Sequence, residues 1–175
     1  MSDDLSYPIG KFQRPASLGT GEFNSEVSRL ETQAERLRSV LEGLNDSQLD
    51  TPYRPGGWTV RQLAHHIADS HMNMYIRLKL ALTEDNPTIK PYDQDAWVLL
   101  SDTREIPIAT SVGILDAVQQ RALSVLRNMS EADRARTFMH PENGPTRLDQ
   151  MTSLYAWHGD HHIAHIKNLR TRMGW

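Results

Sequence analysis

The chain has 175 residues, with 19 Lys and Arg against 22 Asp and Glu, and it contains no cysteine. This length is typical of one domain around one hydrophobic core, which we expect to span residues 1–175. The net charge of −3 and the scattered basic residues argue against a nucleic-acid partner. Without cysteine the chain cannot form disulfides, thiolate nucleophiles or cysteine-type zinc sites.

The first residues and the hydropathy of the chain indicate where in the cell the protein is located. Residues 1–4, Met-Ser-Asp-Asp, lack the basic and apolar regions of a signal peptide. No apolar run reaches the roughly 18 residues that a membrane-spanning helix needs. We therefore expect a soluble, cytoplasmic protein without a membrane partner.

The first half of the chain predicts an arm and two helices. Pro and Gly recur in residues 1–21, which predicts an irregular N-terminal arm. Apolar residues at spacings of three and four then predict a helix over 24–44. After a turn-rich segment, Thr59 and Gln62 have the spacing of a capping box, and they begin a second helix that ends near residue 82.

The second half predicts two more helices after a long connection. Residues 83–109 contain three prolines and room for a short helix over 93–100. A crossover of this length lets the third helix, predicted over 111–128, run parallel to the second. Thr146 is predicted to cap a last helix that ends near residue 173, and no strand ladder is expected. The chain therefore predicts an all-α four-helix bundle, a fold whose core commonly holds metal sites.

Half of the eight histidines lie within eight residues of the last helix: His158, His161, His162 and His165. Residues four apart share one face of a helix, so this cluster contains two pairs that could each offer two imidazoles to a metal ion. A third ligand must come from elsewhere, and the comparable source is the pair at positions 65 and 66. Imidazole ligands suit zinc, nickel, copper or iron, and three of them leave an open position, as in catalytic zinc sites.

Two other kinds of site are disfavoured. Gly159 stands where the zinc-protease motif His-Glu-x-x-His would have its general-base glutamate. The chain also lacks a Gly-rich phosphate loop followed by lysine, so a nucleotide site is not supported.

Several segments together carry a resemblance to a known family: SYPIG at 6–10, LDTPYR at 49–54, GGWTVRQ at 56–62, HHIADSHM at 65–72, IKPY at 89–92, WH at 157–158, HHIAHI at 161–166 and RMGW at 172–175. In these segments the chain resembles the DinB superfamily of four-helix metal proteins, and within it the YfiT group of metal-dependent hydrolases. The resemblance implies the same fold and a homodimer.

The family pattern also implies a set of ligands. In DinB sequences the last helix carries His-x-x-x-His, followed three residues later by Gln, and the first ligand stands eight residues after a tryptophan. Counted from Trp58, the resemblance implies that His66, His158 and His162 bind the metal, with His165 in place of the Gln. His165 lies about 20° from His158 on a helical wheel, which makes it a candidate fourth or orienting ligand.

The other polar residues near the ligands have less specific roles. We expect His65 and His161 to be structural or to lie at the rim of a pocket. Asp69 and Asp160 could orient ligating imidazoles, although carboxylates on a helix are more often solvated.

Three functions follow from these expectations. In the first, one divalent ion, Zn or Ni, activates water and the protein is a hydrolase of a small-molecule substrate, as the YfiT resemblance implies. In the second, the ion binds a low-molecular-weight thiol, as in the bacillithiol and mycothiol S-transferases that share this fold. In the third, the protein binds metal as a stress protein without turnover, because no carboxylate is placed by motif beside the ligands. In either enzymatic reaction, proton transfer would have to use His165, Asp69, Tyr75 or the metal-bound species itself.

Overall fold

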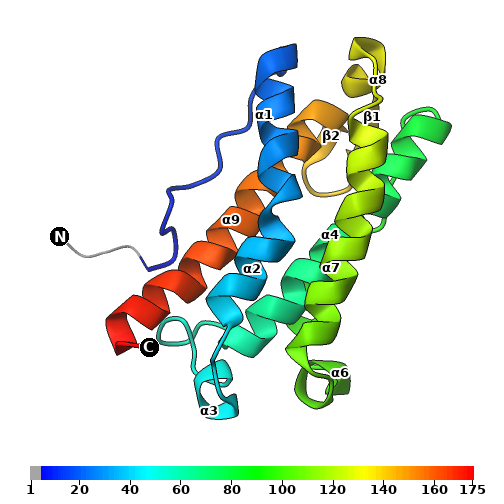
Figure 1. Cartoon of the computed structure of the whole chain (residues 1–175). Helices are drawn as coiled ribbons and strands as arrows, with labels where there is room; N and C mark the ends of the chain where they lie inside the picture. Colours follow the sequence, from blue (N-terminus) through cyan, green and yellow to red (C-terminus); the bar gives the residue numbers. More distant parts are fainter. Residues whose placement is uncertain (1–4) are drawn as a thin grey trace.

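The computed structural model describes residues 5–175, and its long helices form a four-helix bundle (Figure 1). In chain order the elements are α1 (Thr20–Glu31), α2 (Gln33–Leu41), α3 (Asp46–Leu49), α4 (Val60–Thr83), α5 (Gln94–Trp97), α6 (Ser101–Glu105), α7 (Ile108–Leu126), α8 (Glu131–Ala135), β1 (Thr137–His140), β2 (Gly144–Arg147) and α9 (Leu148–Met173). The bundle consists of α4, α7, α9 and the consecutive pair α1–α2. The predicted fold class is confirmed.

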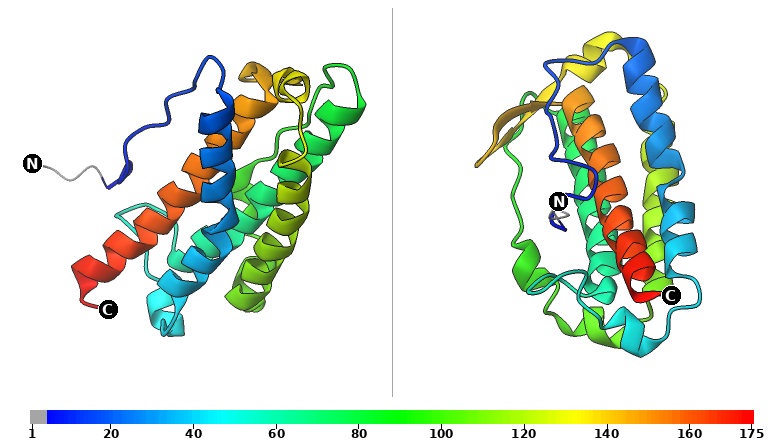
Figure 2. Two further views of the ribbon diagram at one scale, coloured as in Figure 1. Left: turned by 45° about the horizontal axis from the view of Figure 1, so that its top comes forward. Right: turned by 90° about the vertical axis from the view of Figure 1, so that its left-hand side faces the viewer.

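The bundle does not alternate up and down. Figures 1 and 2 show α4 and α7 running in the same direction, with α1–α2 and α9 running the opposite way. The segment between α4 and α7 returns along the bundle and carries the short helices α5 and α6 at its end (Figure 2, right). The long proline-containing connection therefore has the consequence predicted for it, which is a parallel pair of neighbouring helices.

The predicted first helix over 24–44 differs from the structure in two respects. The helical segment runs from Thr20 to Leu41, and it is divided at Thr32. The break frees the carbonyl of Arg29, which accepts hydrogen bonds from the Arg36 Nη2 (3.0 Å) and from the Thr32 hydroxyl (3.3 Å). Side chains thus replace the lost helical bonds, and apolar periodicity alone does not register such a break.

A second difference is the antiparallel hairpin of β1 and β2, where no strands were expected. The turn of the hairpin has Gly144 at φ 71°, and Phe138 packs into the core. Thr146 pairs with Phe138 in the hairpin and does not cap α9, which begins one residue later, after Arg147. The hairpin also binds the start of the crossover, since the Ile89 amide donates to the Met139 carbonyl (3.0 Å).

A buried polar contact fixes α9 against α2. The Gln33 amide donates to the Ala156 carbonyl (2.8 Å) and accepts from the Gln119 Nε2 of α7 (3.1 Å). The same amide lies over Gly159, where an added Cβ would stand only 2.5 Å from its atoms. Only glycine lets the two helices approach this closely, so the position held by glutamate in zinc proteases is occupied here for packing.

Residues 5–19 of the predicted N-terminal arm are irregular and lie along α9 (Figure 2). The Gln150 Nε2 donates to the Pro15 carbonyl (2.9 Å), and the Phe12 ring contacts Trp157 at 5.8 Å between centroids. Residues 1–4, including the acidic start used to argue against a signal peptide, lie outside the described residues. Within residues 5–175, no helix combines the length and the apolar character needed to span a membrane.

Candidate metal centre

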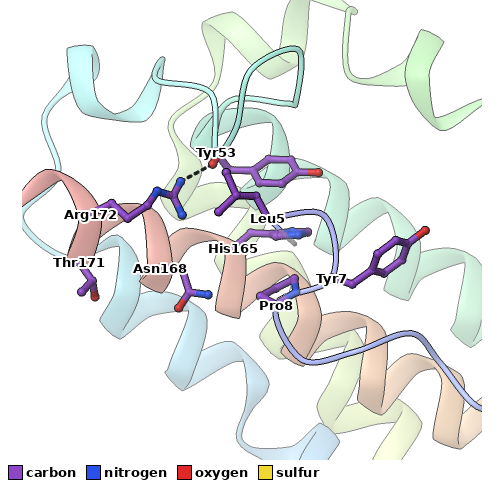
Figure 3. A pocket seen from close by; sticks show the side chains of 8 residues that line it. All are labelled: Leu5, Tyr7, Pro8, Tyr53, His165, Asn168, Thr171 and Arg172. Carbon is purple, nitrogen blue, oxygen red and sulfur yellow. Dashed lines mark hydrogen bonds between the residues drawn. The ribbon is translucent and has the colours of Figure 1, made fainter. Parts of the chain in front are cut away.

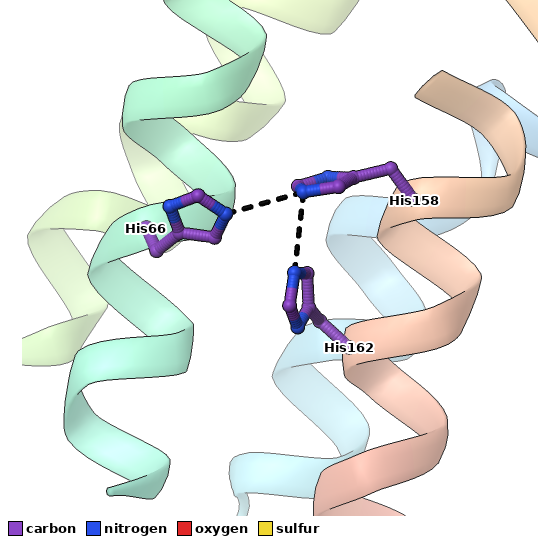
Figure 4. A group of neighbouring side chains, drawn as sticks. All are labelled: His66, His158 and His162. Carbon is purple, nitrogen blue, oxygen red and sulfur yellow. Dashed lines mark hydrogen bonds between the residues drawn. The ribbon is translucent and has the colours of Figure 1, made fainter. Parts of the chain in front are cut away.

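The three histidines expected as ligands come from two helices. The capping box that begins α4 is confirmed, with the Gln62 amide donating to Thr59 Oγ1 (3.1 Å) and the Thr59 amide donating to Gln62 Oε1 (2.9 Å). This start fixes the register of α4 and turns His66, which is 2% exposed, toward α9. His158 and His162 lie one turn apart on α9 and face His66 (Figure 4).

The ring nitrogens of these histidines converge. The Nε2 of His158 lies 3.1 Å from the Nε2 of His66 and 3.2 Å from the Nε2 of His162. Two nitrogens bound tetrahedrally to zinc at about 2.0–2.1 Å are themselves about 3.3–3.4 Å apart. One ligating atom from each of the three side chains lies within 4.8 Å of the others. The donor set and its spacing therefore fit one divalent ion.

Hydrogen bonds among the three rings cannot pair all the nitrogens that converge here. Burial lowers the pKa of His66 to about 4, and burial together with the neighbouring histidines lowers the pKa of His158 and His162 well below the ordinary value. The three imidazoles are therefore neutral at pH 7, the form that binds metals. A neutral His158 has at most one proton on Nε2, although two other nitrogens face that atom, and a shared cation resolves the conflict.

Trp58, the residue from which the ligand register was counted, closes one side of the group. Its ring meets the His66 ring edge-on at 4.7 Å between centroids and lies nearly parallel to the His162 ring at 6.3 Å. An aromatic wall of this kind restricts the rotamers of both imidazoles and excludes water from one side.

Asp69 follows His66 by three residues on α4 and is partly exposed. Burial, and then the nearby charge of Asp102, raise the pKa of Asp69 to about 6. A carboxyl group with this pKa can exchange protons near neutral pH, which suits a general base or acid. Among residues 5–175, no hydrogen bond joins the Asp69 carboxylate to an imidazole, so the structure gives no support for an orienting role.

The other candidates for proton transfer lie elsewhere. Tyr75 comes nine residues after His66, on the opposite face of α4, and its ring contacts the guanidinium of Arg121 on α7 at 5.2 Å. His165 stacks on Tyr53 with ring centroids 4.0 Å apart. The structure therefore brings neither Tyr75 nor His165 to the open side of the three-histidine group.

The remaining predicted residues make structural contacts. His65 points to α7, where its Nδ1 lies 2.7 Å from the Ser111 hydroxyl. His161 stacks on Trp157 at 4.4 Å between centroids. Asp160 neither orients an imidazole nor is solvated, because it pairs with Arg29 (2.8 Å) and Arg36 (2.6 Å) and so ties α9 to α1 and α2.

A cleft of about 610 Å³ lies beside the group, with His158 in its wall. Its polar lining includes Ser70 and Arg77 of α4, Tyr92 of the crossover and Tyr155 of α9. The Arg77 Nη1 donates to the Tyr155 hydroxyl (3.0 Å), and burial raises the pKa of Tyr92 to about 12, so both phenols stay protonated. A small molecule in this cleft would meet these donors next to His158.

Sequence reasoning missed these cleft residues, although the sequence contains a signal for two of them. Tyr155 precedes His158 by three residues and so shares its face of α9, and Arg77 follows His66 by eleven residues and returns to the same face of α4. Applying the helical spacing outward from the histidines identifies both residues.

Comparison with known proteins supports the same family. A family model described as the DinB superfamily matches residues 29–166. A Bacillus mycoides protein named "Putative metal-dependent hydrolase" is 46% identical over 172 residues, 98% of this chain and 99% of its own length. A protein of the same name from Oceanobacillus iheyensis is 48% identical over 169 residues, 97% of this chain and 98% of its own.

Solved structures agree with this assignment. YfiT from Bacillus subtilis, described as "a probable metal-dependent hydrolase with an unusual four-helix bundle topology", superposes with a TM-score of 0.95 at 44% identity, covering 98% of this chain and 99% of YfiT. TT2238, a four-helix bundle protein at 19% identity, has a TM-score of 0.57 over 85% of this chain and 98% of its own, and shares the fold alone. The chain belongs to the DinB superfamily.

Proposed function

We propose that the protein is a metal-dependent enzyme that hydrolyses a small-molecule substrate. The observation that carries the proposal is the convergence of three neutral imidazole nitrogens, from His66, His158 and His162, with His158 also in the wall of a cleft. The names of the relatives and of the YfiT structure support the same class of activity. A divalent ion such as Zn or Ni, when bound, supplies a Lewis acid and lowers the pKa of bound water toward 7.

The residues around the cleft define what the chain itself contributes. His158 and Tyr155 line the cleft from one face of α9, and Ser70 and Arg77 line it from α4. Arg77 has no carboxylate partner among residues 5–175, so its guanidinium is free to bind an anionic group of a substrate. Asp69, with a pKa of about 6, is the carboxylate best suited to accept a proton.

The second candidate function is transfer of a low-molecular-weight thiol to an electrophile. It is favoured by the half-exposed position of Asp69 and by the lack of a hydrogen bond between its carboxylate and the histidines. A thiol bound to a divalent ion loses its proton outright, so this reaction needs less help from a protein base than hydrolysis does. A third candidate, a metal-binding stress protein without turnover, follows if neither reaction occurs.

One assay separates the three functions. An electrophilic ester is presented to zinc-loaded and nickel-loaded protein in water alone and then with a small thiol, and both measurements are repeated after removal of the metal. Hydrolysis predicts a metal-dependent rate that the thiol does not raise, and thiol transfer predicts the reverse. His158→Ala should abolish either rate. His65→Ala should keep it, because the His65 ring faces α7 and not the metal group. If several classes of electrophile show no metal-dependent turnover, the third function, a metal-binding protein without catalysis, is favoured.

A homodimer remains part of the proposal. Leu99 and Leu100, at 70% and 57% exposure, are large apolar side chains that a partner subunit could cover. Sedimentation equilibrium tests this directly, and a mass equal to one chain would contradict it.

A further inference from the structure

Three histidines of α9 form a second group on the other side of His162. One ligating atom from each of His161, His162 and His165 lies within 4.8 Å of the other two. The rings of His161 and His165 are 4.3 Å apart between centroids, and the ring of His162 lies 5.2 Å and 5.5 Å from them. The three-histidine centre uses the Nε2 of His162, and Figure 4 shows its other ring nitrogen on the side away from His158.

The nitrogens of this second group lack partners. The Nδ1 atoms of His161, His162 and His165 are all buried and form no hydrogen bond with residues 5–175. A buried polar atom without a partner is unfavourable, and here three of them lie within two successive turns of one helix. His161 and His165, at 7% and 3% exposure, have little access to bulk solvent that could relieve it.

The surroundings of His165 fix which of its nitrogens can bind a cation. Its Nε2 lies 3.3 Å from the carbonyl oxygen of Ser6, so the proton of the neutral ring is on Nε2 and is donated to the arm. The Nδ1 of His165 therefore carries a free lone pair.

A cavity of about 350 Å³ opens next to His165 and is lined by Tyr53 and by Leu5, Tyr7 and Pro8 of the arm (Figure 3). The stacked ring of Tyr53 holds the His165 ring in place at 4.0 Å between centroids. The cavity leaves room for water beside His165.

We infer that His161, His162 and His165 form a second site for a divalent metal, of the borderline-soft class that imidazole prefers, with His162 shared between the two sites through its two ring nitrogens. The shared neutral ring must lose its one N–H proton to solvent and become an imidazolate when both ions are bound. This cost makes the second site the weaker one, filled after the three-histidine centre. The inference does not depend on the proposed activity.

The test is titration of metal-free protein with Zn²⁺ alone, following bound metal by equilibrium dialysis. The parent should bind a second equivalent at higher metal concentration. His165→Ala and His161→Ala should each lose that second equivalent and keep the first, while His66→Ala should lose the tight first site. His140→Ala is the matched control, because His140 belongs to neither group, and it should bind both equivalents.

A spectroscopic measurement tests the sharing of His162. With Cu²⁺ in both sites, a bridging imidazole couples the two unpaired spins, so the integrated electron paramagnetic resonance signal should fall below that of two isolated ions. A parent that saturates at one equivalent would overturn the second site, as would a His161→Ala, His165→Ala double variant that still binds two. Two equivalents with an uncoupled signal would overturn the bridge. Loss of metal in His66→Ala alone concerns the first centre and leaves this inference standing.

Discussion

The imidazoles of His66, His158 and His162 present their Nε2 atoms to one point, and each contributes a ligand that no neighbour can replace. Residues that only hydrogen-bond to a metal ligand change metal affinity by about 10- to 100-fold when mutated. We predict that alanine at any of the three ligand positions reduces the affinity of the tight site by at least this much. Circular dichroism should show an unchanged helical spectrum, because the apolar clusters of the bundle do not include these rings.

The controls for this experiment are the adjacent histidines. His65→Ala and His161→Ala remove a ring about 100° away on the same helix and should keep the tightly bound metal. If His158→Ala kept full stoichiometry at the tight site, the ligand assignment would be wrong.

Asp69 provides a prediction of pH dependence. Its folded pKa of about 6 lies above its ordinary value of 3.8, so the folded state binds the proton more tightly than the unfolded state. Stability is therefore lost as pH rises from about 4 through 6. A shift of this size corresponds to about 3 kcal/mol for an enclosed group, and solvent screening of the half-exposed carboxylate reduces it to on the order of 1 kcal/mol.

Asp69→Asn removes this titration. Urea denaturation of metal-free protein should show the variant gaining stability over the parent at pH 7.5 but not at pH 4.5. An equal difference at both values would show that the carboxyl does not titrate in this range. Loss of turnover in the same variant, with metal still bound, would support a role in proton transfer.

At the scale of elements, the contact between α2 and α9 depends on Gly159. Its hydrogen faces the Gln33 amide, and a Cβ there would stand 2.5 Å from three amide atoms. We predict that Gly159→Ala lowers the free energy of unfolding by about 1–3 kcal/mol through overpacking and also weakens metal binding at the adjacent His158. Differential scanning calorimetry and metal titration measure the two effects.

Gly113 of α7 is the matched control, since a Cβ at that position meets nothing within 4 Å. Gly113→Ala should be neutral or stabilising by up to about 1 kcal/mol, because alanine has the higher helix propensity. Adding Gln33→Ala to Gly159→Ala relieves the clash, so the double variant should lose less stability than the sum of the single ones. If the stability losses of the two substitutions were additive, the destabilisation by Gly159→Ala would not come from a clash with Gln33.

The long helices were predictable from sequence because their signals are local and strong. The capping box at Thr59 and the spacing of apolar residues fix α4, and the length of the crossover indicates the parallel course of α7. The break at Thr32 was not predictable, because the apolar face continues across it and the Arg36 side chain that stabilises it makes a tertiary contact. Four-residue strands such as β1 are too short to show alternation above the background of a loop.

For the whole molecule, we predict that bound metal stabilises the folded state but that the protein also folds without metal. Chelation should lower the melting temperature while leaving a folded, helical protein, because the apolar core forms from other residues. At a free metal concentration about 100 times Kd, the gain is about 2.7 kcal/mol. Thermal denaturation with and without a chelator measures it, and an unfolded apoprotein would contradict the expectation.

Only the parts of the candidate site that lie within a single helix were predictable from the sequence. The His158/His162 spacing and the position of His66 are visible in the sequence, whereas the tyrosines and Arg77 of the cleft meet through the packing of α4, α9 and the crossover. The position of His165 is likewise a tertiary result, since Tyr53 and the N-terminal arm hold it away from His66. Helical-wheel geometry places His165 near His158 but contains no information on the arm.

We expect His66, His158 and His162 to hold one metal ion beside an open cleft. A crystal structure of the protein loaded with one equivalent of zinc, with the ion located by anomalous scattering, tests it most directly. We predict a single ion bound to the Nε2 atoms of these three residues at about 2.0–2.2 Å, with at least one position occupied by water or a ligand from the cleft. An ion bound without His66, or one enclosed entirely by protein ligands, would contradict this ligand assignment.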